Sequence, residues 1–145
     1  MLDKYNSFVL ASDHAGFNLK QQIKIYLENN NFEVRDLGPF NTDSVDYPDY
    51  AKKIAKRVKD KKSDIGILVC GSGTGMAISA NKIQGIRAAV CYNPSSTRLS
   101  RQHNNANIIA LGSRLTKKSL SLKLVEIFLK TKFEGGRHLR RIKKI

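Results

Sequence analysis

Short apolar runs alternate with amphipathic segments along most of this chain. Five runs predict strands, at positions 7–12, 32–37, 65–70, 88–91 and 108–111. Between them, apolar residues recur every three or four positions, as on the buried stripe of a helix. One stripe comprises Ala51, Ile54, Ala55 and Val58. This strand–helix alternation predicts an α/β fold with a five-stranded parallel sheet and helices on both faces.

Local residues refine this picture of the elements. The run IGILVC at 65–70 is the most apolar, so it predicts a central strand covered on both faces. Pro48 begins one helix, and Asn93-Pro94 is typical of a helix cap followed by proline at the first helical position. The segment 71–75 is a glycine-rich turn, and a helix is expected over 76–82. A basic tail follows Gly135-Gly136.

The 145 residues contain no low-complexity linker or repeat, which predicts a single domain over 1–145. The first residues do not resemble a signal peptide, and no apolar run approaches the length of a membrane span. Only Cys70 and Cys91 are cysteines, too few for a disulfide framework. We therefore expect a cytoplasmic protein.

The positive charge of the chain indicates an anionic binding partner. The formal net charge is +14, and the segment 114–145 holds eleven basic residues against two acidic ones. Such a surface attracts phosphorylated small molecules or nucleic acid, although a solvated basic face is an equally good interpretation. Aromatic residues do not interleave with these bases as a single-strand stacking platform requires.

Polar and reactive residues follow several of the predicted strands. In open parallel sheets, ligands bind outside the carboxyl ends of the strands. Asp13-His14 follows the first strand, Asp46-Tyr47 comes after the second, and Ser113-Arg114 comes after the fifth. Gly71–Gly75 follows the third strand. These residues predict a site at the carboxyl edge of the sheet.

The glycine-rich turn reads G-S-G-T-G. It lacks the G-x-G-x-x-G spacing of a dinucleotide site and the G-x-x-x-x-G-K-[ST] pattern of a phosphate loop, which disfavours nucleotide binding. Glycines let the backbone approach a ligand closely, and a helix N-terminus adds positive partial charge. The turn is therefore better suited to stabilise an oxyanion.

Cys70 stands directly before this turn. A thiol close to a helix N-terminus can act as a base or nucleophile, but a small buried residue that ends a strand is also a good interpretation. Cys91 has no such loop after it and is expected to be structural.

The three histidines, His14, His103 and His138, do not form a helical pair, so the spacing predicts no metal site. Asp13 beside His14 can orient the imidazole. Arg137 and Arg141 are four residues apart and would share a helix face, where they either grip a phosphate or lie in solvent.

The chain resembles the type B ribose-5-phosphate isomerases, a family that includes galactose-6-phosphate isomerase subunits. The matching segments are SDHAGF at 12–17, DYPDYA at 46–51, LVCGSGTGMAISANKIQGIRAA at 68–89, RLSRQHNNANIIALGSR at 98–114 and FEGGRHLRRI at 133–142. The resemblance implies a Rossmann-like α/β/α sandwich, catalysis without metal or other cofactor, and a homodimer, or a tetramer, that shares active sites between subunits. It implies that the basic tail at about 135–145 helps to bind phosphate at the dimer interface.

The resemblance also implies roles for individual residues. Cys70 is the base that moves the proton between C1 and C2, and His103 opens the furanose ring with Asp13 nearby. The implied substrate-binding residues are Asp13, His14, Tyr47, Gly71, Ser72, Gly73, Thr74, Gly75, Asn104, Arg114, Arg137 and Arg141. One branch of the family has a glutamate base directly after the glycine loop. Met76 occupies that position here, so the chain resembles the cysteine branch.

The expected function is therefore isomerisation of ribose 5-phosphate to ribulose 5-phosphate in the pentose phosphate pathway. The alternatives are a six-carbon substrate, such as allose or galactose 6-phosphate, and a basic nucleic-acid-binding module. His103 precedes the fifth strand, whereas Cys70 follows the third, so the two should lie at opposite edges of the sheet. A shared site then requires a second copy of the chain.

Overall fold

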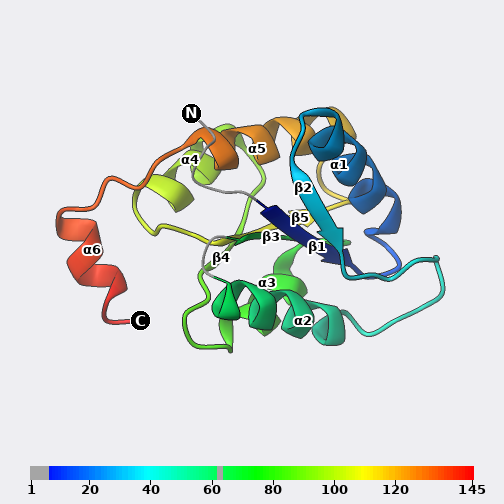
Figure 1. The fold of residues 1–145 in the computed structure, drawn as a ribbon, viewed down its shortest axis with the longest axis horizontal. Coiled ribbons are helices and arrows are strands. Elements are labelled where there is room, and N and C mark those ends of the chain that lie inside the picture. The colour runs from blue at the N-terminus through cyan, green and yellow to red at the C-terminus, as the bar shows by residue number, and fades with distance from the viewer. Residues whose placement is uncertain (1–6, 62–63) are drawn as a thin grey trace.

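The computed structural model describes residues 7–61 and 64–145. Its centre is a five-stranded, all-parallel sheet in the order β2-β1-β3-β5-β4, which confirms the predicted fold class (Figure 1). The strands are β1 (Ser7–Ser12), β2 (Glu33–Asp36), β3 (Asp64–Cys70), β4 (Ala88–Val90) and β5 (Ile108–Gly112). The helices are α1 (Phe17–Asn29), α2 (Tyr47–Asp60), α3 (Thr74–Asn81), α4 (Pro94–Gln102), α5 (Lys118–Lys130) and α6 (Arg137–Ile142).

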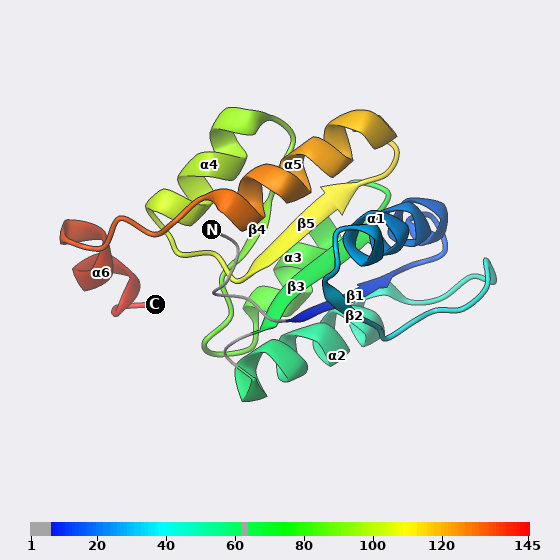
Figure 2. The same cartoon turned by 45° about the horizontal axis from the view of Figure 1, so that its top comes forward.

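Two apolar clusters fill the space between the sheet and its helices. On one face, α1 and α5 pack against strand residues such as Ile67, Val69 and Leu111. On the other, α2 and α3 pack against residues such as Leu68 and Cys70 (Figure 2). Alternate residues of β3 thus serve opposite clusters, and all seven of its residues are buried. The prediction of a central strand covered on both faces is confirmed.

The edges of the elements differ slightly from the sequence pattern. β2 is four residues long because the N–H of Phe32 donates to Leu27 O at the end of α1, not to the neighbouring strand. α3 begins at Thr74, two residues before the predicted start, because Ala77 N–H already donates to Gly73 O (3.1 Å). The Asn93 cap forms as predicted, since its side chain accepts from Ser96 N–H at 2.8 Å.

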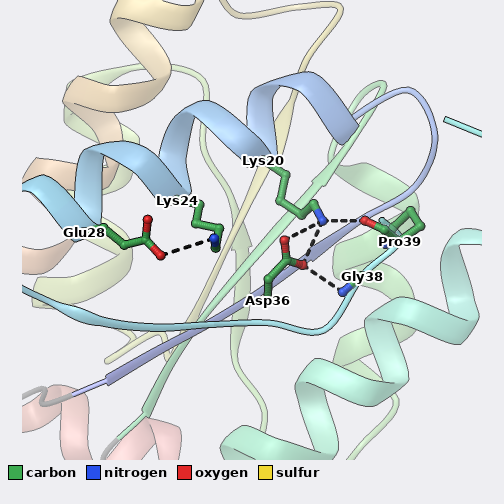
Figure 3. Close-up of polar contacts among 6 residues, drawn as sticks. All are labelled: Lys20, Lys24, Glu28, Asp36, Gly38 and Pro39. Carbon is green, nitrogen blue, oxygen red and sulfur yellow. Dashed lines mark hydrogen bonds and ion pairs between the residues drawn. The ribbon is translucent and has the colours of Figure 1, made fainter. Parts of the chain in front are cut away.

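A buried ion pair anchors the segment that leads from β2 toward α2. The ammonium of Lys20, on α1, donates to both oxygens of Asp36 (2.8 and 2.9 Å) and to Pro39 O (2.6 Å), as Figure 3 shows. Lys20 has no exposed surface. The segment after Pro39 reaches Val45 and Tyr47, so this ion pair supports one side of the site described next.

The basic tail contains the short helix α6, which projects from the body of the sheet beyond the amino ends of the strands (Figures 1 and 2). Gly135 and Gly136, which precede it, both have positive φ (68° and 55°), a backbone conformation that glycine adopts without strain. None of the helices in the described ranges has the length and apolarity needed to cross a membrane.

Candidate active site

A pocket of about 310 Å³ opens at the carboxyl edge of the sheet. Its lining comes from four separate segments of the chain: Asp13, Tyr47, Cys70, Gly71, Ser72, Gly75, Arg114 and Leu115. All but Leu115 are residues that the sequence predicted. The rule that ligands bind at the carboxyl ends of parallel strands therefore located a real cavity.

Cys70 lines this pocket and is 5% exposed. Its Sγ accepts a hydrogen bond from Gly73 N–H at 3.1 Å. Gly73 has φ of +80°, and it directly precedes α3. An N–H that points at sulfur, together with the positive end of a helix, places donors and positive partial charge beside the reactive atom. The arrangement therefore favours the interpretation of Cys70 as a base over its interpretation as a purely structural residue.

The rest of the glycine loop is held by an internal hydrogen bond and leads into a helix start with backbone N–H donors. Ser72 Oγ accepts from Thr74 N–H at 3.2 Å, which tightens the turn. The first N–H groups of an α-helix have no acceptor within the helix. In α3 these belong to Thr74, whose N–H donates to Ser72, and to Gly75 and Met76; of these, Gly75 lines the pocket. The loop can therefore stabilise negative charge on a bound ligand.

Asp13 and His14 are held by separate contacts. The carboxylate of Asp13 accepts from Gly16 N–H at 2.9 Å, and its side chain is nearly buried. His14 Nδ1 accepts from Val45 N–H at 3.3 Å. This bond assigns the proton of the neutral ring to Nε2, which is left to donate to a ligand. The expected orientation of His14 by Asp13 is therefore replaced by orientation through the backbone at Val45.

Arg114 reaches the pocket because its loop is tied to two others. Ser113 Oγ donates to Ala15 O (2.9 Å), and Arg114 N–H donates to Gly71 O (3.0 Å). A Cβ on Gly71 would lie 3.2 Å from a guanidinium nitrogen of Arg114. Glycine at 71 thus allows the positive charge to lie across the mouth of the glycine loop.

Tyr47 closes the opposite side of the pocket. Its ring covers Gly75 so closely that a Cβ there would be 2.8 Å from two ring carbons. Leu115 is the lining residue that sequence reasoning missed. It directly follows Arg114 in the same loop, but an apolar side chain carries no chemical signal that would have singled it out.

The other predicted residues are not brought to this pocket. His103 and Asn104 directly follow α4, before β5 begins, while Arg137 and Arg141 lie on the projecting α6 (Figure 2). β5 alone, with five residues, spans about 15 Å between the two edges. The placement of His103 at the amino edge, away from Cys70, agrees with the topological prediction.

The residues at the amino edge form their own group. The rings of His103 and His138 stack with centroids 4.2 Å apart and planes 12° from parallel. Burial lowers the pKa of His138 below its usual value, and repulsion from His103, Arg137 and Arg141 adds to this effect. Sequence reasoning singled out neither His138 nor Glu134, although their spacing of four residues was available as a signal.

Comparisons with known proteins identify relatives of this chain. The family model described as Ribose/Galactose Isomerase matches residues 8–145. The chain is 45% identical to the Ribose-5-phosphate isomerase B of Escherichia coli, over 92% of this chain and 89% of the relative. Its structure is similar to a ribose 5-phosphate isomerase from Thermotoga maritima (TM-score 0.93, 51% identity, 95% of each chain). It is also similar to Ribose-5-phosphate Isomerase B from Mycoplasma genitalium with bound ribulose-5-phosphate (TM-score 0.91, 45% identity, 95% and 92% of the chains).

Proposed function

The chain belongs to the ribose/galactose isomerase family, and we propose that it interconverts ribose 5-phosphate and ribulose 5-phosphate through an enediolate. The observation that carries this proposal is the position of Cys70 in the lining of the pocket, with Gly73 N–H directed at its sulfur. The relatives named as ribose-5-phosphate isomerases, one of them described with bound ribulose-5-phosphate, support the same substrate.

In the proposed reaction, the thiolate of Cys70 removes the proton from C2 of the open-chain aldose. The electron pair moves to form the C1–C2 double bond, and negative charge develops on the O1 oxygen of the enediolate. N–H groups at the start of α3 stabilise that oxygen. Transfer of the O2 proton to O1, together with return of a proton to C1, gives the ketose. A positioned acid–base group contributes about 10²- to 10⁴-fold in rate, and one oxyanion donor about 10²- to 10³-fold.

The phosphate requires positive or N–H-donating groups at a distance from Cys70. His14 and Arg114 are available at the carboxyl edge, and Arg137 and Arg141 are available on α6. Arginine binds phosphate through paired N–H donors, which suits this role. We assign phosphate binding to these four side chains, and we assign Asp13 and His103 to opening of the furanose ring.

Because the two groups of residues lie at opposite edges of one chain, the proposed site needs a second copy. In a two-fold dimer, each subunit gives and receives the same residues. The chain then forms a homodimer in which His103, Asn104, Arg137 and Arg141 complete the pocket of the other subunit. Two buried free cysteines suit a reducing compartment, so we place the enzyme in the cytoplasm.

The activity is tested by an isomerase assay with ribose 5-phosphate and allose 6-phosphate as rival substrates. Higher kcat/KM for ribose 5-phosphate is expected, and a clear preference for the six-carbon substrate would overturn the assignment. Complementation tests the shared site. Cys70→Ala and His103→Ala variants, each inactive, are unfolded and refolded together. Half the dimers are then mixed, and each mixed dimer has one intact site, so about a quarter of the sites should recover. No recovery despite demonstrated subunit exchange would place both residues in one site within a chain.

A further inference from the structure

Three side chains with metal-ligand chemistry meet at the amino edge of the sheet. His103 caps the C-terminus of α4, Glu134 lies in the loop between α5 and α6, and His138 lies in the first turn of α6. Glu134 Oε2 is 3.6 Å from His138 Nε2 and 4.0 Å from His103 Nε2. One ligand atom from each residue lies within 4.8 Å of the other two, and within 7–61 and 64–145 no other such group occurs.

We propose that His103, Glu134 and His138 form a binding site for a divalent transition-metal ion of the Zn²⁺ type. Two imidazole nitrogens and one carboxylate oxygen are a donor set that Zn²⁺ accepts, with its fourth position left to water or a ligand. The site lies away from the Cys70 pocket of the same chain, and its existence does not depend on the isomerase activity.

The distances require only small movements. Bonds of about 2.0–2.2 Å in a tetrahedron place ligand atoms roughly 3.3–3.5 Å apart. The distances to Glu134 exceed this by less than about 1 Å. The stacked rings impose one further change, because nearly parallel imidazoles do not direct their lone pairs at one point, so a ring has to rotate.

The half-exposed members of the group can make that rotation. The side chains of His103 and Glu134 are 38% and 49% exposed, whereas His138 is only 9% exposed. His138 is therefore the fixed ligand, and the other two close on the ion. The loop is already in place for this, since Glu134 N–H donates to Gln102 O (3.1 Å) next to His103.

The surrounding charge selects among metals. Arg137, Arg140 and Arg141 on α6 repel any cation, and Glu134 supplies a single negative charge. Mg²⁺ and Ca²⁺ need several oxygen ligands, so this site should not retain them. Imidazole suits Zn²⁺, Cu²⁺ and Ni²⁺, whose bonds to nitrogen offset part of the repulsion.

A bound ion also has a consequence for catalysis, which rests on the proposed function. Coordination occupies the lone pair of His103 Nε2, so this residue can no longer exchange a proton with the sugar ring. Zn²⁺ should therefore inhibit isomerisation of the cyclic substrate, and a chelator should restore it.

The test is Zn²⁺ binding to the full chain without a histidine tag, measured by competition with a chromophoric chelator. One ion per chain is expected. Glu134→Gln and His138→Gln should each weaken binding at least 10-fold, since even loss of a residue that only supports a ligand costs about 10- to 100-fold. Co²⁺ should give the visible absorption of a tetrahedral site, and this absorption should disappear in both variants.

Two matched variants serve as controls. Glu33→Gln removes an exposed carboxylate from β2, and Cys70→Ala removes the thiol, the strongest rival ligand. Binding unchanged by Glu134→Gln, or lost in Cys70→Ala, would overturn the proposed site. Since Glu134 is half exposed, its variant should keep the wild-type circular dichroism. Binding at the three residues without inhibition would support the metal site and contradict the role of His103 in ring opening.

Discussion

Replacing Lys20 by methionine should destabilise the protein far more than the same replacement at Lys24. Figure 3 shows both lysines on α1, one in a buried ion pair and the other in a surface pair. Lys20 contacts Asp36, whose side chain is 8% exposed, and Pro39 O. Lys24 contacts Glu28 at 3.2 Å, with side chains that are 34% and 46% exposed. Methionine keeps most of the apolar stem of lysine and removes the charge.

The magnitude follows from what each replacement leaves behind. Lys20→Met leaves the Asp36 carboxylate inside the protein without its cation, which costs about 3–5 kcal/mol. Among the residues that the structure describes, Gly38 N–H, at 2.8 Å, is the donor that this carboxylate retains. An exposed helical pair such as Lys24–Glu28 contributes about 0.3–0.5 kcal/mol. At roughly 3 °C per kcal/mol for a chain of this size, the expected losses in Tm are about 10 °C or more against about 1 °C.

Urea denaturation monitored by circular dichroism provides the measurement. The free energy of unfolding is obtained for wild type, Lys20→Met, Lys24→Met, Asp36→Asn and the double variant at 20 and 36. The double variant should be more stable than the sum of the two single losses predicts, because it removes the unpaired charge. A loss below 1 kcal/mol for Lys20→Met, or strict additivity of the two single changes, would refute the reasoning.

The remaining predictions concern the site. Cys70→Ala should abolish isomerisation with little change in substrate binding, while Cys91→Ala should retain activity. Burial raises the pKa of the Cys91 thiol, so iodoacetate should label Cys70 first, as measured in a peptide map. Arg137→Ala should raise KM for ribose 5-phosphate about 10- to 100-fold, the loss of one charge-assisted contact, and should hardly affect the slow reaction of unphosphorylated ribose. Equal effects on both substrates would make α6 structural. Gly75→Ala should displace the exposed ring of Tyr47 at little cost in Tm and lower kcat/KM about 10-fold or more, and unchanged kinetics would contradict the role of that close contact.

The sequence predicted those parts of the fold where one strong local pattern decides the structure. β3 has seven buried residues and no polar interruption after Asp64, so its central position was evident. β2 alternates exposed and half-buried residues at an edge, which is why its length was overestimated. The burial of Lys20 was not predictable, because a lysine within a helical stripe is normally read as solvated and its partner, Asp36, is distant in sequence.

The site was predictable to a similar extent. The order of residues along the chain predicted which of them share an edge of the sheet, but it did not predict their individual contacts. Cys70, Tyr47 and Arg114 were predicted to share an edge because each follows a strand or precedes a helix in a parallel sheet. The hydrogen bond from Gly73 N–H to sulfur was not predictable, because it depends on the backbone angles of a single glycine. The stack of His103 on His138 likewise depends on the direction in which Gly135 and Gly136 send the tail.

The direction of the tail helps to explain why the residues predicted for the site form two groups, one at each edge of the sheet. A parallel sheet sorts its loops, so segments that follow strands gather at one edge and segments that precede strands gather at the other. His103 precedes β5 and therefore lies with the αβ loops, and α6 leaves the body from the same edge without folding back toward Cys70 (Figure 2). No rotation of side chains can cross the length of β5, so joining the two groups requires a second chain. In the homodimer that we propose, an isologous two-fold contact would bring the amino edge of each copy to the carboxyl edge of the other and complete both sites with one interface.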